Sequence, residues 1–407
     1  MSDLIPTTEE NTFISSNLDC DISALALKLG RHSLFNVQRV LRQIAGYQVI
    51  KKKVPAWYAN PDLVFPASLS LEQCSSEITA NYKSGIVKRI LDNSSVKNQM
   101  ADLTGGLGVD FTFMANCFDK ATYVERQSEL CDIAQHNFEV LGLSNAEVFN
   151  SDGIEFLKTS QQKYDLIYLD PARRDSKGVK AVMLYDCEPD MTLIKNQLLE
   201  KASIVMVKLS PMLDISMALK QLHETVEVHV VSVDNECKEL LFVLKPGDDE
   251  IQTTLHCVNL LSNSEIREFV FTKKDEQEAV CIYADKPGKY LYEPNASLLK
   301  AGAFCMISKT FNLKKLHPNS HLYTSDNYLS DFPGRGFEVD KYFSYQPKIM
   351  KSHLGGVDKA NITVRNFNDT VADIRKKSKI GEGGDLYLFA TTLYDGKKVI
   401  ISCKKNN

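Results

Sequence analysis

Residues 102–110 read Asp-Leu-Thr-Gly-Gly-Leu-Gly-Val-Asp and stand between an apolar run, Met100–Thr104, and an amphipathic stretch. The apolar run predicts a buried strand, and the recurrence of Val109, Phe113 and Phe118 beyond the glycines predicts a helix. Glycines at such a turn let the backbone approach a ligand closely, because no Cβ is there to collide with it. The segment therefore predicts a ligand site at a strand–helix turn, with an ordinary tight turn as the alternative.

Further short apolar runs alternate with amphipathic stretches on both sides of this turn. The runs are Met100–Thr104, Ala121–Val124, Glu147–Asn150, Leu166–Leu169, Ile204–Val207, Val226–Val233 and Leu240–Leu244. Near-continuous apolar strands that alternate with helices predict an α/β fold with a parallel sheet covered on both faces. The last two runs are joined by too few residues for a crossover helix, so we expect them to form an antiparallel hairpin at the sheet edge.

The remaining segments predict a chain of four parts. Residues 20–92 have helical signals, among them Asp21 as the cap of a helix that runs to Leu29 and a capping-box pattern at Ser70–Gln73. Lys245–Glu250 is a charged, turn-rich linker, and an α+β region follows it. We predict a helical region at residues 1–92, the α/β domain at 93–248, a linker with a small α+β region at 249–334 and a last domain at 335–407.

The charges are unevenly distributed along the chain. The 407 residues carry a formal net charge of −4, which disfavours a generic nucleic-acid binder. Residues 335–407 nevertheless contain 14 Lys/Arg against 8 Asp/Glu. This local excess is compatible with binding to nucleic acid, and a solvated charged surface is the alternative.

Several classes of protein are disfavoured by composition. The ten cysteines include no Cys-x-x-Cys pair, so we expect reduced core cysteines, and the eight histidines form no ligand-spaced cluster, so we expect no metal. The polar start of the chain lacks the pattern of a secretory leader, and no apolar run approaches the roughly 20 residues that span a bilayer. We therefore expect a cytoplasmic protein that does not bind a membrane.

The residues around the glycine turn favour S-adenosylmethionine (AdoMet) as the ligand. Asp102 stands just before the glycines, where a carboxylate suits a cationic amino group. The glycines do not follow the dinucleotide order G-x-G-x-x-G, and the Lys-Ser/Thr of a phosphate-binding loop is missing. The candidate cofactor-binding residues of this turn are Asp102, Thr104, Gly105, Gly106, Gly108 and Asp110.

The next two predicted strands also end in polar residues. Glu125, followed by Arg126, comes 19 residues after Gly106, a spacing at which an acidic residue can accept hydrogen bonds from ribose hydroxyls. Asp152, followed by Gly153, ends the third strand and can accept a hydrogen bond from the adenine amino group. An exposed glutamate at a strand end and an aspartate in a plain turn are the alternatives.

The fourth strand ends in Asp170-Pro171-Ala172-Arg173. Ligands of open α/β sheets bind at the carboxyl ends of the strands, so a carboxylate there can orient an amine beside the reacting methyl group. Asp170, Pro171 and Arg173 are therefore the candidate catalytic residues, although an Asp-Pro pair can also simply end a strand. The four motifs follow one another in order, each at the end of a predicted strand.

This series resembles motifs one to four of the class I AdoMet-dependent methyltransferases, whose Rossmann-like sheet has seven strands with the last one hairpinned in. The whole chain resembles a family of bacterial candidate methyltransferases with a ferredoxin-like insert and a C-terminal THUMP-like domain. The segments that carry this closer likeness are Leu71–Glu77 with Thr79, Tyr82 and Lys83, Asp170–Arg173, Lys208–Pro211, Glu293–Asn295 and Phe332–Gly336.

The resemblance implies AdoMet as the cofactor and structured RNA, ribosomal or transfer RNA, as the substrate. The amino-methyltransferase motif Asp/Asn-Pro-Pro-aromatic is altered here, since Ala172 and Arg173 stand in its last two positions. Arginine can stack on a base or bind a phosphate, so a base amine remains the expected acceptor. The motif contains no cysteine, which disfavours a cysteine-nucleophile mechanism. The alternatives are a non-catalytic RNA-binding protein with this fold and a methyltransferase that acts on DNA, protein or a small molecule.

A few features outside the four motifs are weaker candidates. Lys83 lies on a predicted N-terminal helix that can cover the cofactor, and Lys208–Pro211 ends the fifth strand at the same sheet edge. The basic run Arg375–Lys379 can contact RNA phosphates, and a solvated charge run is the alternative. Trp57 can stack a base, although a structural role in packing is the stronger reading.

Overall fold

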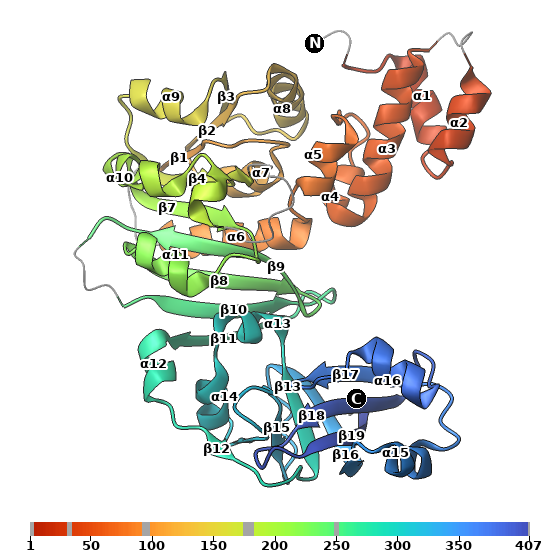
Figure 1. The fold of residues 1–407 in the computed structure, drawn as a ribbon. Helices are drawn as coiled ribbons and strands as arrows, with labels where there is room; N and C mark the ends of the chain where they lie inside the picture. The colour runs from red at the N-terminus through yellow and green to blue at the C-terminus, as the bar shows by residue number, and fades with distance from the viewer. Residues whose placement is uncertain (1–3, 31–34, 92–97, 174–182, 248–251, 406–407) are drawn as a thin grey trace. The chain divides into compact units, whose positions relative to one another are not determined.

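The computed structural model describes residues 4–30, 35–91, 98–173, 183–247 and 252–405 (Figure 1). The predicted boundaries near residues 92 and 248 lie outside these described residues. The chain forms two compact units. The first comprises residues 1–227 and 239–251, and the second comprises residues 228–238 and 252–407. Among the described residues, no helix is long and apolar enough to cross a membrane.

The first unit begins with a helical region, as predicted. Its helices are α1 (Thr8–Ser16), α2 (Ile22–Leu29), α3 (Val37–Lys53), α4 (Pro55–Tyr58), α5 (Ser68–Gln73) and α6 (Glu77–Leu91). Asp21 caps α2 through a 2.8 Å hydrogen bond from the backbone N–H of Ala24. The capping box predicted at Ser70 is wrong, because α5 already begins two residues earlier and has no side-chain cap.

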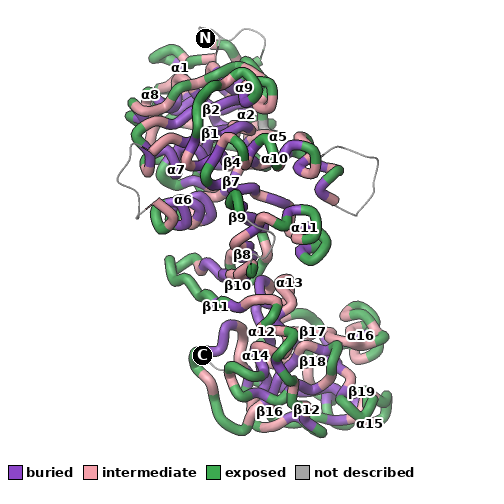
Figure 2. The backbone as a smooth tube through the Cα atoms, turned by 90° about the vertical axis from the view of Figure 1, so that its left-hand side faces the viewer, coloured by how far each residue is buried: buried purple, intermediate pink, exposed green. Residues whose placement is uncertain are grey.

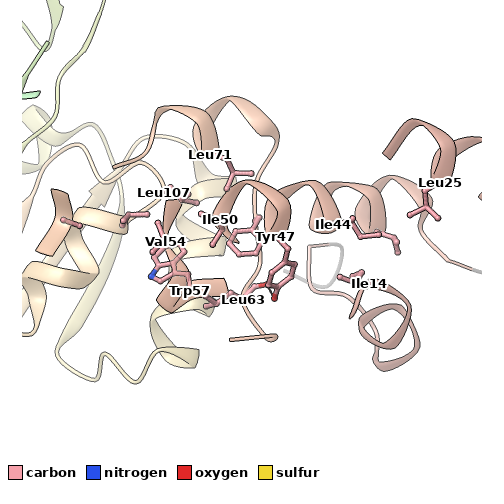
Figure 3. Packing of buried hydrophobic residues seen from close by; sticks show 14 residues of the cluster. Ile14, Leu25, Ile44, Tyr47, Ile50, Val54, Trp57, Leu63, Leu71 and Leu107 are labelled. Carbon is pink, nitrogen blue, oxygen red and sulfur yellow. Dashed lines mark hydrogen bonds between the residues drawn. The ribbon is translucent and has the colours of Figure 1, made fainter. Parts of the chain in front are cut away.

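A hydrophobic core joins these helices to the glycine-rich turn. Figure 3 shows apolar side chains of α1, α3, α4 and α5 gathered around Tyr47 and Trp57, together with Leu107 from the turn itself. Trp57 is only 2% exposed, which confirms its structural role. The N-terminal helices are therefore part of the scaffold that holds the turn in place.

The sheet of the first unit contains six of the strands predicted from the apolar runs. They are β1 (Gln99–Asp102), β2 (Lys120–Glu125), β3 (Ala146–Asn150), β4 (Tyr164–Leu169), β7 (Ala202–Leu209) and β9 (Glu236–Leu244). Their order is β9-β7-β4-β1-β2-β3, with parallel pairing from β7 to β3 and antiparallel pairing of β7 with β9. Strands β1, β2, β4 and β7 are mostly buried, whereas β3, at the end of this order, has no buried residue (Figure 2).

The helices of this sheet follow its strands in turn. They are α7 (Val109–Ala115), α8 (Ser128–Val140), α9 (Gly153–Thr159), α10 (Met191–Lys201) and α11 (Ile215–Gln221). Helix α6 packs on α7, and α9 packs on α10 (Figure 1). A short two-stranded ribbon, β5 (Ala172–Arg173) with β6 (Cys187–Glu188), follows β4, and a 3-10 turn, η1 (Leu184–Asp186), precedes β6.

Strand β8 (Thr225–Val233) precedes β9 and lies next to it in the strand order, as in class I methyltransferases. Both strands run from the first unit into the second. The expectation that this hairpin forms the sheet edge is wrong, because β10 (Thr254–Leu260) lies on the other side of β8 and pairs with β11 (Ile266–Thr272). The linker sequence gave no sign that the chain returns as another strand.

The rest of the second unit is an α+β region, as predicted. Its sheet has the order β12-β14-β15-β13-β16-β19-β18-β17. The strands are β12 (Ile282–Tyr283), β13 (Tyr290–Pro294), β14 (Lys314–Lys315), β15 (Tyr323–Ser325), β16 (Gly334–Ser344), β17 (Asn361–Arg365), β18 (Leu386–Thr392) and β19 (Lys398–Lys405). The helices are α12 (Lys273–Glu278), α13 (Ala296–Ala301), α14 (Phe304–Thr310), α15 (Pro347–Leu354) and α16 (Val371–Ser378).

One expectation about the cysteines is corrected in this unit. Cys281 and Cys305 form a disulfide, whereas the sequence predicts reduced cysteines throughout. The two residues are 24 positions apart in the sequence, and the tertiary fold brings their Cα atoms to a distance of 4.8 Å. The other eight cysteines are free, as expected, but of these only Cys131, Cys187, Cys257 and Cys403 are buried in the core.

Candidate active site

The glycine turn follows β1 and is held by side chains of the neighbouring strand β2. A Cβ on Gly105 would meet Cε2 of Tyr123 at 2.2 Å, and Gly106 and Gly108 have φ values of +57° and +83°. Tyr123 also donates a 2.5 Å hydrogen bond to the carbonyl of Gly106. Glycine is therefore required at Gly105 for packing against a buried ring, in addition to any approach of a ligand.

Asp102 ends β1 with its carboxyl group buried rather than lining an open site. The side chain is 2% exposed and accepts a 2.9 Å hydrogen bond from the backbone N–H of Thr104. Burial, reinforced by the nearby carboxylates of Asp110 and Asp170, raises the pKa of Asp102 from its usual 3.8 to about 8. At neutral pH this carboxyl group is therefore mainly protonated, and a cation beside it would favour its ionised form.

Glu125 ends β2 and supports the glycine turn directly. Its Oε2 accepts a 2.9 Å hydrogen bond from the N–H of Gly106, and its Oε1 accepts one of 2.9 Å from the N–H of Gln127. Each carboxylate oxygen has a second lone pair, so Glu125 can still accept a hydrogen bond from a ligand. Its neighbour Arg126 is exposed and forms a 2.7 Å ion pair with Glu188 of β6.

Asp152 caps α9, and the glycine beside it packs on the first turn. Oδ1 of Asp152 accepts hydrogen bonds from the N–H groups of Ile154 and Glu155 at 2.9 and 3.1 Å. A Cβ on Gly153 would meet the carbonyl oxygen of Leu103 at 2.2 Å. The end of β3 therefore approaches the glycine turn closely, while Asp152 remains exposed.

Asp170 follows β4 and is tied to the same turn. The backbone N–H of Asp170 donates a 2.6 Å hydrogen bond to Oγ1 of Thr104. The backbone N–H of Thr104 in turn donates a hydrogen bond to the carboxyl group of Asp102. The Asp170 side chain is 40% exposed, and its Oδ2 accepts a hydrogen bond from the ammonium group of Lys208 on β7. Pro171 is buried, and Ala172 and Arg173 form β5; the side chain of Arg173 lies outside the described residues.

Beneath Asp170 lies a buried group of charges. Asp110, in the first turn of α7, accepts hydrogen bonds from Ser75 at 2.7 Å and from Tyr168 at 2.8 Å. Lys83 of α6 lies 3.2 Å from Asp110 and donates a 2.6 Å hydrogen bond to Glu239. Lys83 is fully buried, and its contact with Asp110 places it beside the first turn of α7.

Burial and ion pairing act in opposite directions on these charged groups. Burial would raise the pKa of Asp110, but Lys83 and Lys208 outweigh it and hold that pKa below its usual range. Burial dominates for Glu239 and raises its pKa. Burial would lower the pKa of Lys208, but Asp170 and Asp110 raise it overall, so this amine stays protonated.

Three family models match separate parts of the chain. Residues 89–231 match the family described as conserved hypothetical protein 95, residues 290–333 match a ferredoxin-like domain, and residues 334–405 match a THUMP domain-like family. No curated protein matches the chain in sequence. The matches to the two C-terminal domains agree with the family that the sequence resembles.

A solved structure decides the family. The crystal structure of a candidate methyltransferase from Porphyromonas gingivalis W83 is 33% identical in sequence, and the match covers 100% of this chain and 99% of that chain with a TM-score of 0.86. The chain belongs to this methyltransferase family. Two other similar structures are yhhF from Escherichia coli (18% identity, 41% and 88% of the two chains, TM-score 0.30) and a T. thermophilus 16S rRNA methyltransferase (15%, 44% and 45%, 0.33).

The methyltransferase contains site residues that the sequence did not reveal. Three further residues complete the buried charge group: Glu239, Ser75 and Tyr168. Glu239 comes from β9, Ser75 from the segment before α6, and Tyr168 from β4. The signal for Glu239 was an acidic residue directly before an apolar strand. Such a residue usually marks an exposed strand end, so a buried partner for Lys83 was not inferred.

In the methyltransferase, two side chains of the basic run at the end of α16 form intramolecular contacts. Arg375 donates hydrogen bonds to the carbonyls of Gly381 and Ala360 at 2.5 and 3.2 Å. Lys377 pairs with Asp369. Lys376 and Lys379 are exposed, so only part of this run is available to a ligand.

Proposed function

We propose that this methyltransferase transfers the methyl group of AdoMet to a base amine of structured RNA, ribosomal or transfer RNA. The observation that carries the proposal is the pair of hydrogen bonds at Thr104. This residue ties Asp102, at the start of the glycine turn, to the backbone of Asp170, at the end of β4. This tie would hold a cofactor at the turn and an acceptor amine at Asp170 in a fixed position relative to each other.

The residues present fit AdoMet. The glycine turn at 105–108 leaves space next to Gly106, where a Cβ would have no neighbour closer than 3.7 Å. We assign Glu125 to the ribose hydroxyls and Asp152 to the adenine amino group, each with acceptor capacity left beyond its backbone contacts. A cationic amino group near Asp102 would stabilise that carboxylate, which burial now disfavours. When bound, AdoMet supplies an electrophilic methyl group on a sulfonium.

Asp170 is assigned to hold the acceptor amine. Its carboxylate is partly exposed, and the Lys208 ammonium occupies Oδ2 while leaving acceptor capacity on the group. An amine that donates a hydrogen bond to Asp170 points its lone pair away from the carboxylate, toward the methyl group. Placement of the two reactants, rather than a strong base, is then the main contribution of the protein. The amine can release its proton after it has become cationic.

The choice of RNA is supported by the C-terminal region. Residues 334–405 match a THUMP domain-like family, and residues 335–407 carry 14 Lys/Arg against 8 Asp/Glu. A basic surface suits a polyanion. Among the site residues, Pro171 and Arg173 would lie next to the base, with Arg173 able to stack on it.

A non-catalytic RNA-binding protein is the second candidate. One observation favours it, because Ala172 and Arg173 are engaged in the β5–β6 ribbon at the place where the usual motif has proline and an aromatic residue. Both candidates predict RNA binding, but only the first predicts transfer of a methyl group to the RNA.

Two measurements test the proposal. Isothermal titration of the full-length protein should show AdoMet binding, and its absence would remove the enzyme function. Mass spectrometry of total RNA nucleosides from a strain that lacks this gene should then show the loss of one methylated nucleoside. An unchanged nucleoside profile together with intact AdoMet binding would point to DNA, protein or a small molecule as the substrate.

A further inference from the structure

Glu293 of β13 is held between two arginines that lie far apart in the sequence. Arg335 of β16 donates hydrogen bonds from Nε (3.0 Å) and Nη2 to Oε2 of Glu293. Arg365 of β17 donates from Nε (3.2 Å) and Nη2 (2.9 Å) to Oε1. Both oxygens of one carboxylate are thus engaged by two guanidinium groups.

The local sequence explains how Arg335 reaches this position. Strands β13 and β16 are antiparallel, and Glu293 lies directly opposite Arg335. The backbones approach closely at Gly334, because a Cβ there would meet the carbonyl oxygen of Glu293 at 2.2 Å. The segments Glu293–Asn295 and Phe332–Gly336, which carry part of the family likeness, are therefore two sides of a single structural feature.

Arg365 reaches the same carboxylate from the opposite end of the sheet. Strand β17 is the last strand in the order, and three strands separate it from β13. The neighbouring Asn366 has a positive φ of +51° and donates a 2.9 Å hydrogen bond to Nδ1 of His317, which lies just beyond β14. These contacts fix the end of β17 over the β13 and β14 region, so the Arg365 position is well defined.

The charge of this triad exceeds what a structural ion pair needs. One arginine would neutralise Glu293, and the second leaves the group with a net charge of +1. The carboxylate side chain is 3% exposed, whereas the side chains of Arg335 and Arg365 are 38% and 33% exposed. The surface of the triad is therefore cationic, with its anion covered.

Each guanidinium also keeps hydrogen-bonding capacity. A guanidinium has five N–H donors in a fixed plane, and Glu293 takes those of Nε and Nη2. The cationic field extends beyond the triad. The pKa of His321 is lowered to about 4, first by burial and then by Lys315 and Arg365. That histidine is therefore neutral at pH 7, so it adds no charge to the surface.

We propose that Arg335 and Arg365 together bind a backbone phosphate of the RNA substrate. Guanidinium forks match the oxygens of a phosphodiester in geometry and charge better than lysine ammonium groups do. Glu293 holds both forks in place before binding, which reduces the side-chain entropy lost when the phosphate arrives. The inference rests on the proposed function for its choice of RNA, while the site itself requires only a phosphate group.

RNA affinity measured against salt tests the site in the full-length protein. The probe is a fluorescein-labelled RNA hairpin read by fluorescence anisotropy, and the variants are Arg335→Gln and Arg365→Gln. We expect each to weaken binding about 5- to 10-fold near 0.1 M salt and to reduce the slope of log affinity against log salt by about 1. Lys286→Gln is the matched control, since it removes one exposed charge from the same unit and has no role in the proposed site. Losses no larger than that of the control would overturn the proposal.

Two further measurements separate this inference from misfolding and from a wrong substrate. Arg335→Lys and Arg365→Lys keep the charge but lose the fork, so each should weaken hairpin binding about 3-fold while the protein stays folded by circular dichroism; unchanged affinity would contradict the site. Inorganic phosphate, titrated by calorimetry, should bind the wild type and not the double Gln variant. Phosphate binding without hairpin binding supports the site and removes RNA as the substrate. If the double Gln variant still binds phosphate, the proposed site is wrong.

Discussion

Lys208 of β7 donates a hydrogen bond from its ammonium group to Oδ2 of Asp170, the residue that follows β4. The same ammonium lies 3.3 Å from Oγ of Ser75 and 3.7 Å from Asp110. Because the two strands are parallel neighbours, both side chains leave the sheet at the same edge. Lys208 therefore holds the carboxylate to which we assign the acceptor amine, and it is a positioning residue for the proposed reaction.

Replacement of Lys208 tests this role. We expect Lys208→Met to lower kcat about 10- to 100-fold, because Asp170 loses the partner that orients it, whereas AdoMet affinity should change less than about 2-fold. Lys208→Arg should restore part of kcat. Single-turnover methyl transfer and calorimetry with AdoMet measure the two quantities. A variant with normal kcat, or one that fails only in AdoMet binding, would contradict the assignment.

A methyl group at Gly105 should disrupt the cofactor site. The Cβ of Gly105→Ala would meet Cε2 of Tyr123 at 2.2 Å. We expect a loss of about 1–3 kcal/mol in the free energy of unfolding, as for other overpacked cores, and a large loss of AdoMet affinity. Gly85→Ala is the control, since its Cβ has no neighbour within 4 Å and it lies within α6. There we expect a gain of roughly 0.5–1 kcal/mol. Urea unfolding and AdoMet titration compare the two variants.

The buried pair of Lys83 and Glu239 should be costly to break from one side. The exposed fractions of the two side chains are 0% and 4%, so removal of one partner leaves an uncompensated buried charge. We expect Lys83→Met to reduce the free energy of unfolding by about 3–5 kcal/mol, and the double variant Lys83→Met, Glu239→Gln to recover part of that loss. Equilibrium unfolding in urea gives the values. Additive effects of the two substitutions would show that the pair is not coupled.

Asp102 should make stability depend on pH in a defined direction. Its pKa is about 8 in the folded protein against a usual 3.8, because burial favours the neutral acid. Between these values the folded state holds a proton that the unfolded chain has lost. The free energy of unfolding should therefore fall as pH rises through this range and level off above about 8. Asp102→Asn should flatten this part of the profile. Urea unfolding from pH 4 to pH 9 measures the profile of both proteins. If the free energy of unfolding falls equally steeply with pH in the wild type and in Asp102→Asn, the assignment is wrong.

Local patterns in the sequence predicted much of the fold. Apolar runs alternating with amphipathic stretches gave the strand and helix sequence of the first unit, since a strand buried on both faces needs apolar side chains throughout. The glycine turn and the Asp170 motif were located because each follows such a strand. The sheet edge and the disulfide were missed, since both depend on segments distant in the chain.

The sequence by itself determined which residues end the successive strands, because apolar runs mark strands that are buried on both faces and the length of each connection separates a parallel crossover from a hairpin. Tertiary structure alone decided what those residues bond to. Asp102 and Lys83 are buried, and Glu125 accepts a hydrogen bond from the glycine turn. Glu293 forms ion pairs with two arginines. The physical reason is that burial and charge pairing depend on packing between distant segments, which a local pattern does not record.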